Sequence, residues 1–160
     1  MAEEEVESRE QRTESRAVEV ALDRFREKFN CAEAVLMGLV EAFDLDRTSV
    51  PRIATAFGGG MGGTGEACGA LIGAFMAFGL KFGRDRADDL DAKAAAGGRA
   101  RELLRAFQAE FGRVRCIELT GCDMSTPEGM ARAKELDLHM SFCPKFVEFA
   151  AREAAGLLDT

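Results

Sequence analysis

The sequence predicts an all-α protein, a single compact bundle of six or seven helices that contains one glycine-rich loop. Apolar residues recur at three- and four-residue steps along most of the chain, as they do on one face of a helix. Val and Ile, which favour strands, number only eight and three, and no segment sustains an apolar-polar alternation. A chain of 160 residues fits one domain that buries its own core.

The chain opens with a charged segment that has little to bury. Residues 1–15 are almost all charged or polar, so we expect a charged N-terminal tail, either mobile or a frayed helical extension. The helical domain follows over residues 16–160. Its first helix is indicated by apolar residues at helical spacing from Val18 and runs to about Lys28.

Two helices are expected before the glycine-rich loop. Asn30 and Glu33 match a capping box, which starts a second helix at Cys31. A short third helix starts at Ser49 and ends at Phe57, where the glycine run stops it.

The fourth helix is expected over residues 66–82, directly after the glycine-rich loop. Within it, Gly69, Gly73 and Ala77 lie four residues apart and form a strip of small residues. Another helix can therefore approach this face closely, while the large apolar residues of the opposite face point into the core.

Three helices complete the predicted bundle. A long fifth helix covers residues 88–111 and is interrupted by Gly97-Gly98, which weakens or bends it. A short sixth helix follows Thr126-Pro127, and the last helix opens at Ser141.

The amino-acid composition argues against several classes of partner. The net charge of −7 disfavours nucleic acid and anionic membranes as partners, because phosphate binding needs clustered cations. The longest uncharged run, residues 67–80, falls short of the roughly 20 residues that span a membrane, so membrane insertion is not expected.

The first residues do not resemble a signal peptide, which favours a cytoplasmic location. Thiols stay reduced there, so the five cysteines indicate metal, redox or packing roles.

The glycine run resembles two known nucleotide-binding motifs, but the residues around it do not fit either one. Gly58-x-Gly60-x-x-Gly63 fits the dinucleotide fingerprint, but no hydrophobic strand precedes or follows it. A P-loop is excluded because no lysine follows Gly63. Two interpretations stay open: a tight connector, or a loop that wraps a small ligand or a thiol-bound centre. The candidate cofactor-binding residues of that loop are Gly59, Gly60, Gly62 and Gly63.

Three cysteines fall in or just before the first turn of a predicted helix, namely Cys31, Cys68 and Cys143. A helix N-terminus lowers the pKa of a thiol and stabilises the thiolate, which attacks disulfides or binds metal. Cys68 follows the flexible glycine loop, so we expect it to be the most reactive or the most strongly ligating of the five cysteines. Glu33 and Glu66 would raise these pKa values if they pointed at the sulfurs. The alternative is that the cysteines are small, buried apolar residues.

His139 is the only histidine, four residues before Cys143. A metal-ligand or proton-transfer role is open, but we interpret it as an exposed loop histidine. With one histidine and no nucleophile elbow around any serine, a Ser-His-Asp hydrolase is not predicted.

Four ordered segments also carry a family resemblance. They are Asn30-Cys31-Ala32-Glu33-Ala34-Val35-Leu36, then Phe57-Gly58-Gly59-Gly60-Met61-Gly62-Gly63 leading into Cys68-Gly69-Ala70-Leu71-Ile72-Gly73, then Cys116-Ile117-Glu118-Leu119-Thr120-Gly121, and Cys143-Pro144-Lys145-Phe146-Val147. From about residue 30 to residue 149, the chain resembles the family of small redox-active proteins labelled C_GCAxxG_C_C.

The resemblance implies a helical domain with a redox or metal-related role, and whether the protein is an oxidoreductase-type enzyme stays open. In one interpretation the catalytic thiols Cys31, Cys68, Cys116 and Cys143 cycle with a disulfide. In a second, the same four thiolates bind an iron–sulfur cluster or another soft metal. In a third, the protein is a ligand-binding or interaction bundle with inert cysteines. Either chemistry requires the four sulfurs to gather in one region.

The family also looks related to the helical domain of split-Soret cytochromes. This chain has no C-x-x-C-H motif, so covalent haem is not expected. Cys122 falls outside the four-cysteine pattern. The sequence does not name the redox partner, and a homo-oligomer stays open.

Overall fold

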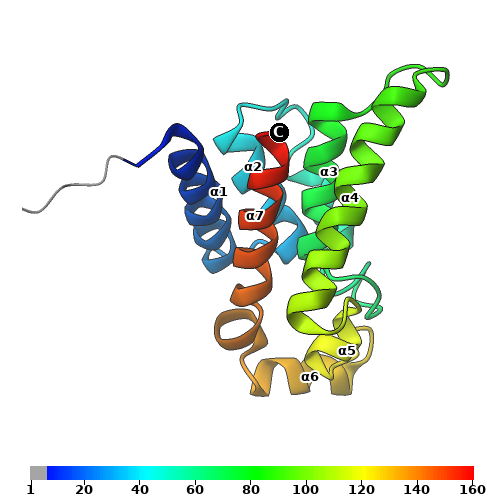
Figure 1. The fold of residues 1–160 in the computed structure, drawn as a ribbon. Coiled ribbons are helices and arrows are strands. Elements are labelled where there is room, and N and C mark those ends of the chain that lie inside the picture. Colours follow the sequence, from blue (N-terminus) through cyan, green and yellow to red (C-terminus); the bar gives the residue numbers. More distant parts are fainter. Residues whose placement is uncertain (1–6) are drawn as a thin grey trace, which may run out of the picture.

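The computed structural model describes residues 7–160 as an all-α bundle, which confirms the predicted fold class (Figure 1). The expected N-terminal tail is divided: residues 1–6 lie outside the described part, and residues 9–15 belong to the first helix. The elements are α1 (Arg9–Arg26), α2 (Cys31–Ala42), the 3₁₀-helix η1 (Arg52–Phe57), α3 (Gly69–Phe82), α4 (Leu90–Phe111), α5 (Cys116–Thr120), α6 (Pro127–Glu135), the π-helix η2 (Leu138–Phe142) and α7 (Pro144–Leu158).

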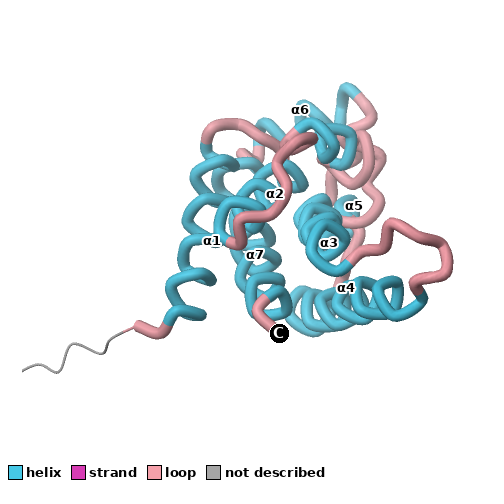
Figure 2. Tube along the Cα trace, turned by 90° about the horizontal axis from the view of Figure 1, so that it is seen from above, coloured by secondary structure: helices cyan, strands magenta, loops and turns pink. Residues whose placement is uncertain are grey.

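The direction of the long helices decides where their first residues meet. Helices α2, α3 and α7 run in one direction, and α1 and α4 run in the other (Figure 1). Helix α2 packs against α1, α3 and α7, and it is buried along most of its length (Figure 2). The N-termini of α2, α3 and α7 therefore lie at the same end of the bundle, where α5 and α6 are also found.

Aromatic packing joins α4 to α7 at that end. The ring of Phe111 lies 4.8 Å from Phe146 and 5.2 Å from Phe149, both in edge-to-face geometry. Phe107 adds tilted contacts to the same cluster. Such pairs contribute about 0.5–1.5 kcal/mol each beyond their burial, so the cluster fixes the start of α7 against α4.

Several helix boundaries differ from the predicted ones. Helix α3 begins at Gly69, three residues late, because residues 66–68 are extended and pair with residues 114–116. Helix α4 is continuous through Gly97-Gly98 and is not interrupted there. The third helix ends at Phe57 as predicted, but it is a 3₁₀-helix.

The C-terminal part holds two elements that the sequence analysis did not predict. The short helix α5 follows the extended pairing, and the π-helix η2 precedes α7. Ser141 lies inside η2, where its hydroxyl donates to Asp137, so it does not cap the last helix. Helix α7 instead begins at Pro144 with Cys143 as its N-cap. No helix of the described part is long and apolar enough to span a membrane.

The predicted strip of small residues is the contact between α3 and α2. A Cβ on Gly73 would clash with the carbonyl oxygen of Ala32, whereas a Cβ on Gly79 of the same helix would meet nothing within 4 Å. We therefore expect Gly73→Ala to lower the free energy of unfolding by about 1–3 kcal/mol. The matched variant Gly79→Ala should raise it by about 0.5–1 kcal/mol through helix propensity. Urea denaturation of the two variants measures both values, and equal stabilities would contradict the tight helix contact.

Candidate thiol site

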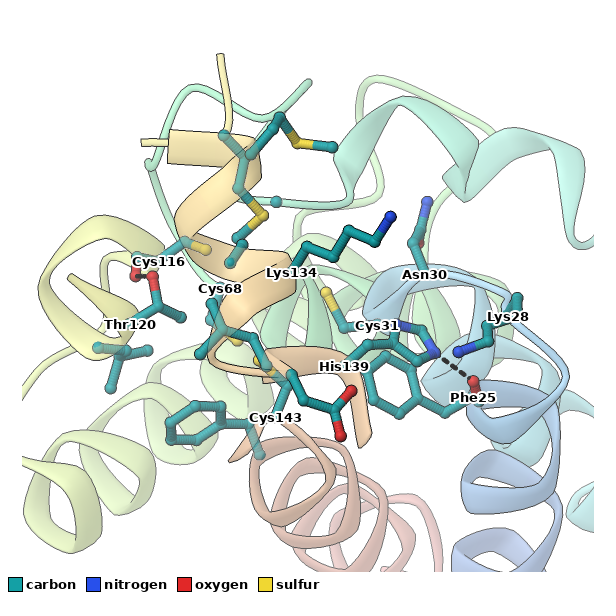
Figure 3. Close-up of a pocket in the computed structure, with 18 residues that line it drawn as sticks. Phe25, Lys28, Asn30, Cys31, Cys68, Cys116, Thr120, Lys134, His139 and Cys143 are labelled. Carbon is teal, nitrogen blue, oxygen red and sulfur yellow. Dashed lines mark hydrogen bonds between the residues drawn. The ribbon is translucent and has the colours of Figure 1, made fainter. Parts of the chain in front are cut away.

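A cavity of about 460 Å³ lies at the end of the bundle where α2, α3 and α7 begin. Four of the five cysteines line it, and they come from four different helix starts (Figure 3). The structure thus brings together Cys31, Cys68, Cys116 and Cys143, as the sequence analysis expected. Cys122 is buried but does not line the cavity.

Each of the four cysteines stands at a helix N-terminus. Cys31 and Cys116 are the first residues of α2 and α5, while Cys68 and Cys143 are the N-cap residues of α3 and α7. The sequence analysis placed three of them at helix starts and missed Cys116. The contacts that fix these helix N-termini therefore determine the surroundings of the four thiols.

The capping box predicted for α2 is present and fixes Cys31. The side chain of Asn30 accepts the Glu33 amide at 2.9 Å, and Glu33 accepts the Asn30 amide at 2.8 Å. The second carboxylate oxygen of Glu33 accepts the hydroxyl of Thr55 at 2.6 Å. The buried carboxylate of Glu33 is thus engaged by an amide and a hydroxyl. The groups that act on the Cys31 thiol are instead the Cys68 thiol and the amides of Gly59, Ala32 and Cys31 itself.

An antiparallel bridge between Ala67 and Arg115 positions Cys68 and Cys116. The amide of Cys68 donates to the carbonyl of Val114 at 2.8 Å, and the amide of Cys116 donates to the carbonyl of Glu66 at 2.7 Å. Glu66 also pairs with Arg115 at 3.2 Å. These contacts hold the two cysteines on neighbouring segments although they are far apart in sequence.

Gly69 allows the first turn of α3 to reach Cys31. A Cβ at this position would lie 2.5 Å from the Cys31 sulfur and 3.0 Å from the carbonyl oxygen of Phe57. Any larger residue would push the two helix starts apart. The Cys-Gly dipeptide thus brings the Cys68 thiol beside the Cys31 thiol.

The pKa of Cys31 is lowered to about 7, mainly because the Cys68 thiol donates a hydrogen bond to its sulfur. Burial opposes this effect, but the amides of Gly59, Ala32 and Cys31 itself add further hydrogen bonds. Hydrogen bonds to the charged form favour it over the neutral form. Cys31 is therefore about half ionised at neutral pH.

The pKa of Cys68 moves in the opposite direction and rises well above its ordinary value. The largest cause is the same hydrogen bond to Cys31, which requires the Cys68 proton, and burial and the nearby negative charge add to it. The expectation that Cys68 ionises most readily is therefore wrong. The hydrogen bond to Cys31 and burial raise the pKa of Cys68 more than its helix N-terminus lowers it, so Cys31 is the more readily ionised of the two thiols.

The other two thiols of the cavity stay protonated at neutral pH. Burial is the largest cause of the raised pKa of Cys116, about 11, and of Cys143, about 12. The negative charge of Cys31 raises both values further, while the Thr120 hydroxyl partly offsets the shift of Cys116.

The glycine-rich loop touches the cavity at one point. All four candidate glycines have positive φ, from 64° at Gly59 to 80° at Gly63, a conformation that side chains rarely adopt. Only Gly59 lines the cavity, and its amide donates to Cys31. Gly60 packs against the backbone of Glu66, and Gly63 packs against the backbone of Met124. Gly62 does not line the cavity either.

His139 differs from the expected exposed loop histidine. It lies in η2, is partly buried and stacks on Phe25 with ring centroids 3.9 Å apart. Its Nε2 is 2.5 Å from the carbonyl oxygen of Phe25 (Figure 3). Because that oxygen can only accept, the Nε2 atom carries a proton. His139 thus joins η2 to the end of α1 and forms part of the cavity wall.

The sequence analysis also missed Lys28 and Lys134, which line the cavity from the turn after α1 and from α6. The only local signal was that Lys28 stands shortly before Cys31. Lys134 lies on a helix without buried residues, so its sequence shows a solvent-exposed helix and nothing more.

Metal binding requires several ligands around one point. Within residues 7–160, no group of three His, Cys, Asp or Glu side chains is arranged to hold a metal ion. Binding by Cys31, Cys68, Cys116 and Cys143 would require these side chains to move.

The match to a protein family covers most of the chain. A family model described as "Putative redox-active protein (C_GCAxxG_C_C)" matches residues 29–157. The chain belongs to this family. All four cysteines of the cavity fall inside the matched range. No curated protein and no solved structure matches the chain.

The hydrogen bond between the two thiols leads to a direct test. We expect Cys68→Ala to raise the pKa of Cys31 from about 7 toward its ordinary value of 9.0, because the main stabilising donor is removed. Only the thiolate is alkylated, so the rate of iodoacetamide reaction at pH 7 should fall about tenfold. The pH dependence of Cys31 labelling, followed by mass spectrometry, measures the shift. Cys122→Ala is the control, and an unchanged profile in Cys68→Ala would contradict the pairing.

Proposed function

We propose that this member of the C_GCAxxG_C_C family carries out thiol–disulfide exchange, with Cys31 as the attacking thiol and Cys68 as the resolving thiol. The observation that carries the proposal is the close contact between the first turns of α2 and α3, which brings the Cys68 thiol beside Cys31, where it lowers the pKa of Cys31 to about 7 while its own pKa is raised. An ionised thiol beside a protonated partner is the starting state that this reaction requires.

Exposure supports the assignment of the two roles. Cys31 is partly exposed and lines the cavity, so a substrate disulfide can reach its sulfur. Cys68 is only 5% exposed, so it reacts most readily with a sulfur already inside the site. A pKa near the ambient pH also suits the attacking thiol, because it combines a large thiolate fraction with high nucleophilicity.

The exchange proceeds in two steps that conserve electrons. The Cys31 thiolate attacks a substrate disulfide, forms a mixed disulfide and releases one substrate thiolate. That thiolate takes the proton of Cys68, and the Cys68 sulfur then attacks Cys31 and releases the second substrate thiolate. Two protein thiols are oxidised to one disulfide while one substrate disulfide is reduced to two thiols.

Cys116 and Cys143 have a supporting place in this scheme. Their raised pKa values keep them protonated at neutral pH, so they do not compete with Cys31 for the substrate. As neutral thiols they line the cavity without adding negative charge beside the reacting sulfur.

Trapping the intermediate tests the order of the two steps. With the neutral reagent bis(hydroxyethyl) disulfide, the reduced parent protein should form one internal disulfide between Cys31 and Cys68. Cys68→Ser should stop at a stable mixed disulfide on Cys31, and Cys31→Ser should lose the fast reaction, because only the attacking thiolate starts the exchange. Mass spectrometry of blocked, digested samples identifies each product.

Cys122→Ser is the matched control for the trapping experiment, since Cys122 is buried outside the cavity. It should behave as the parent protein does. A first adduct on Cys116 or Cys143 would contradict the assigned roles. Stoichiometric iron after anaerobic purification, with Cys31 protected from alkylation, would favour the metal-binding interpretation instead.

A further inference from the structure

The cavity around the thiol pair has a size and charge that restrict what can react there. Its volume of about 460 Å³ lies within the ordinary range of small-molecule sites, roughly 300–1,000 Å³. Both Cys31 and Cys68 belong to its wall. A disulfide on the flat surface of a folded protein does not reach into such a space, whereas a small disulfide does.

The charged side chains that line the cavity are unevenly distributed. Lys28 and Lys134 contribute two cations, and Asp137 contributes the one carboxylate. Asp137 also accepts the hydroxyl of Ser141 at 2.9 Å. With Cys31 about half ionised, the cavity wall still carries slightly more positive than negative charge, in a chain whose net charge is −7.

Neither lysine forms an ion pair with any residue in the described part of the chain. Both are exposed, so their ammonium groups can meet an incoming ligand. Lys134 extends across the cavity toward Asn30, and Lys28 lies beside His139 (Figure 3). The two cations thus come from different elements and border the site that holds the Cys31 sulfur.

The rest of the wall is mainly apolar. Leu119, Met124 and Met130 line it together with the rings of Phe25 and Phe146. An apolar body of modest size can be buried there while charged ends stay near the lysines. This combination suits a ligand with an uncharged centre and anionic termini.

We infer that the cavity takes a low-molecular-weight disulfide bearing carboxylate groups, which Lys28 and Lys134 attract and orient toward Cys31. The inference rests on the proposed thiol–disulfide exchange and specifies its substrate class. The disulfide bond enters the apolar space, one carboxylate is drawn to each lysine, and the reaction consumes two protein thiols and yields two small carboxylate-bearing thiols.

A series of three disulfides of similar size tests the charge preference. Dithiodipropionate carries two carboxylates, bis(hydroxyethyl) disulfide is neutral, and cystamine carries two ammonium groups. Each rate of Cys31 oxidation is divided by the rate of the same reagent with a small free thiol, which removes intrinsic reactivity. At low salt, the anionic reagent should react about tenfold faster than the neutral one, and cystamine should be slowest. The preference should shrink at about 1 M salt.

The double variant Lys28→Gln/Lys134→Gln should lose this preference while still reacting with the neutral reagent. Lys93→Gln is the control, because Lys93 is an exposed lysine of α4 that does not line the cavity. Equal normalised rates for the anionic and neutral reagents in the parent protein would overturn the inference. So would a preference that persists in the double variant with an unchanged circular dichroism spectrum. Failure of the neutral reagent to oxidise Cys31 would instead overturn the proposed exchange itself.

Discussion

The close contact between the first turns of α2 and α3 is the constraint on which the site depends. Gly69 and Gly73 face α2, and a Cβ at either position would collide with Cys31 or Ala32. The two helices run in the same direction, so this contact joins their N-termini and places both thiols at one end of the bundle. The packing of small residues against α2 therefore determines how close the Cys31 and Cys68 thiols lie.

Two contacts from outside α3 complete that arrangement. The capping box of Asn30 and Glu33 fixes the start of α2. The bridge between Ala67 and Arg115 keeps the residues before α3 extended, so that Cys68 is the N-cap residue and does not lie within a helical turn. The thiol pair is therefore held from both sides by backbone hydrogen bonds, which favours a defined geometry over a flexible one.

The sequence predicted the elements more reliably than the electrostatics of the site. Helix-spaced apolar residues and the Asn30 capping box are local signals, and they located α2, the end of α1 and the start of α7 within a few residues. The start of α1 was missed, because residues 9–15 are charged or polar and still helical. The extended segment before α3 depends on pairing with residues 114–116, which no local pattern reveals. Likewise, a helix N-terminus argued for ionisation of Cys68, but the deciding hydrogen bond comes from a residue 37 positions away in sequence, the difference between 68 and 31. Lys134 gave no signal because its helix is exposed.

The two chemistries proposed for these cysteines require different numbers of ionised thiols. At neutral pH only Cys31 is substantially ionised, since Cys68, Cys116 and Cys143 all have raised pKa values. A metal ion held by all four sulfurs requires every ligand as thiolate, so its uptake would release about three further protons against the effect of burial. Disulfide exchange requires one thiolate to begin, and the Cys68 proton is transferred only when the first product leaves. The thiol that would start the proposed exchange is thus the one whose pKa is lowered, and the other three thiols of the cavity have raised pKa values.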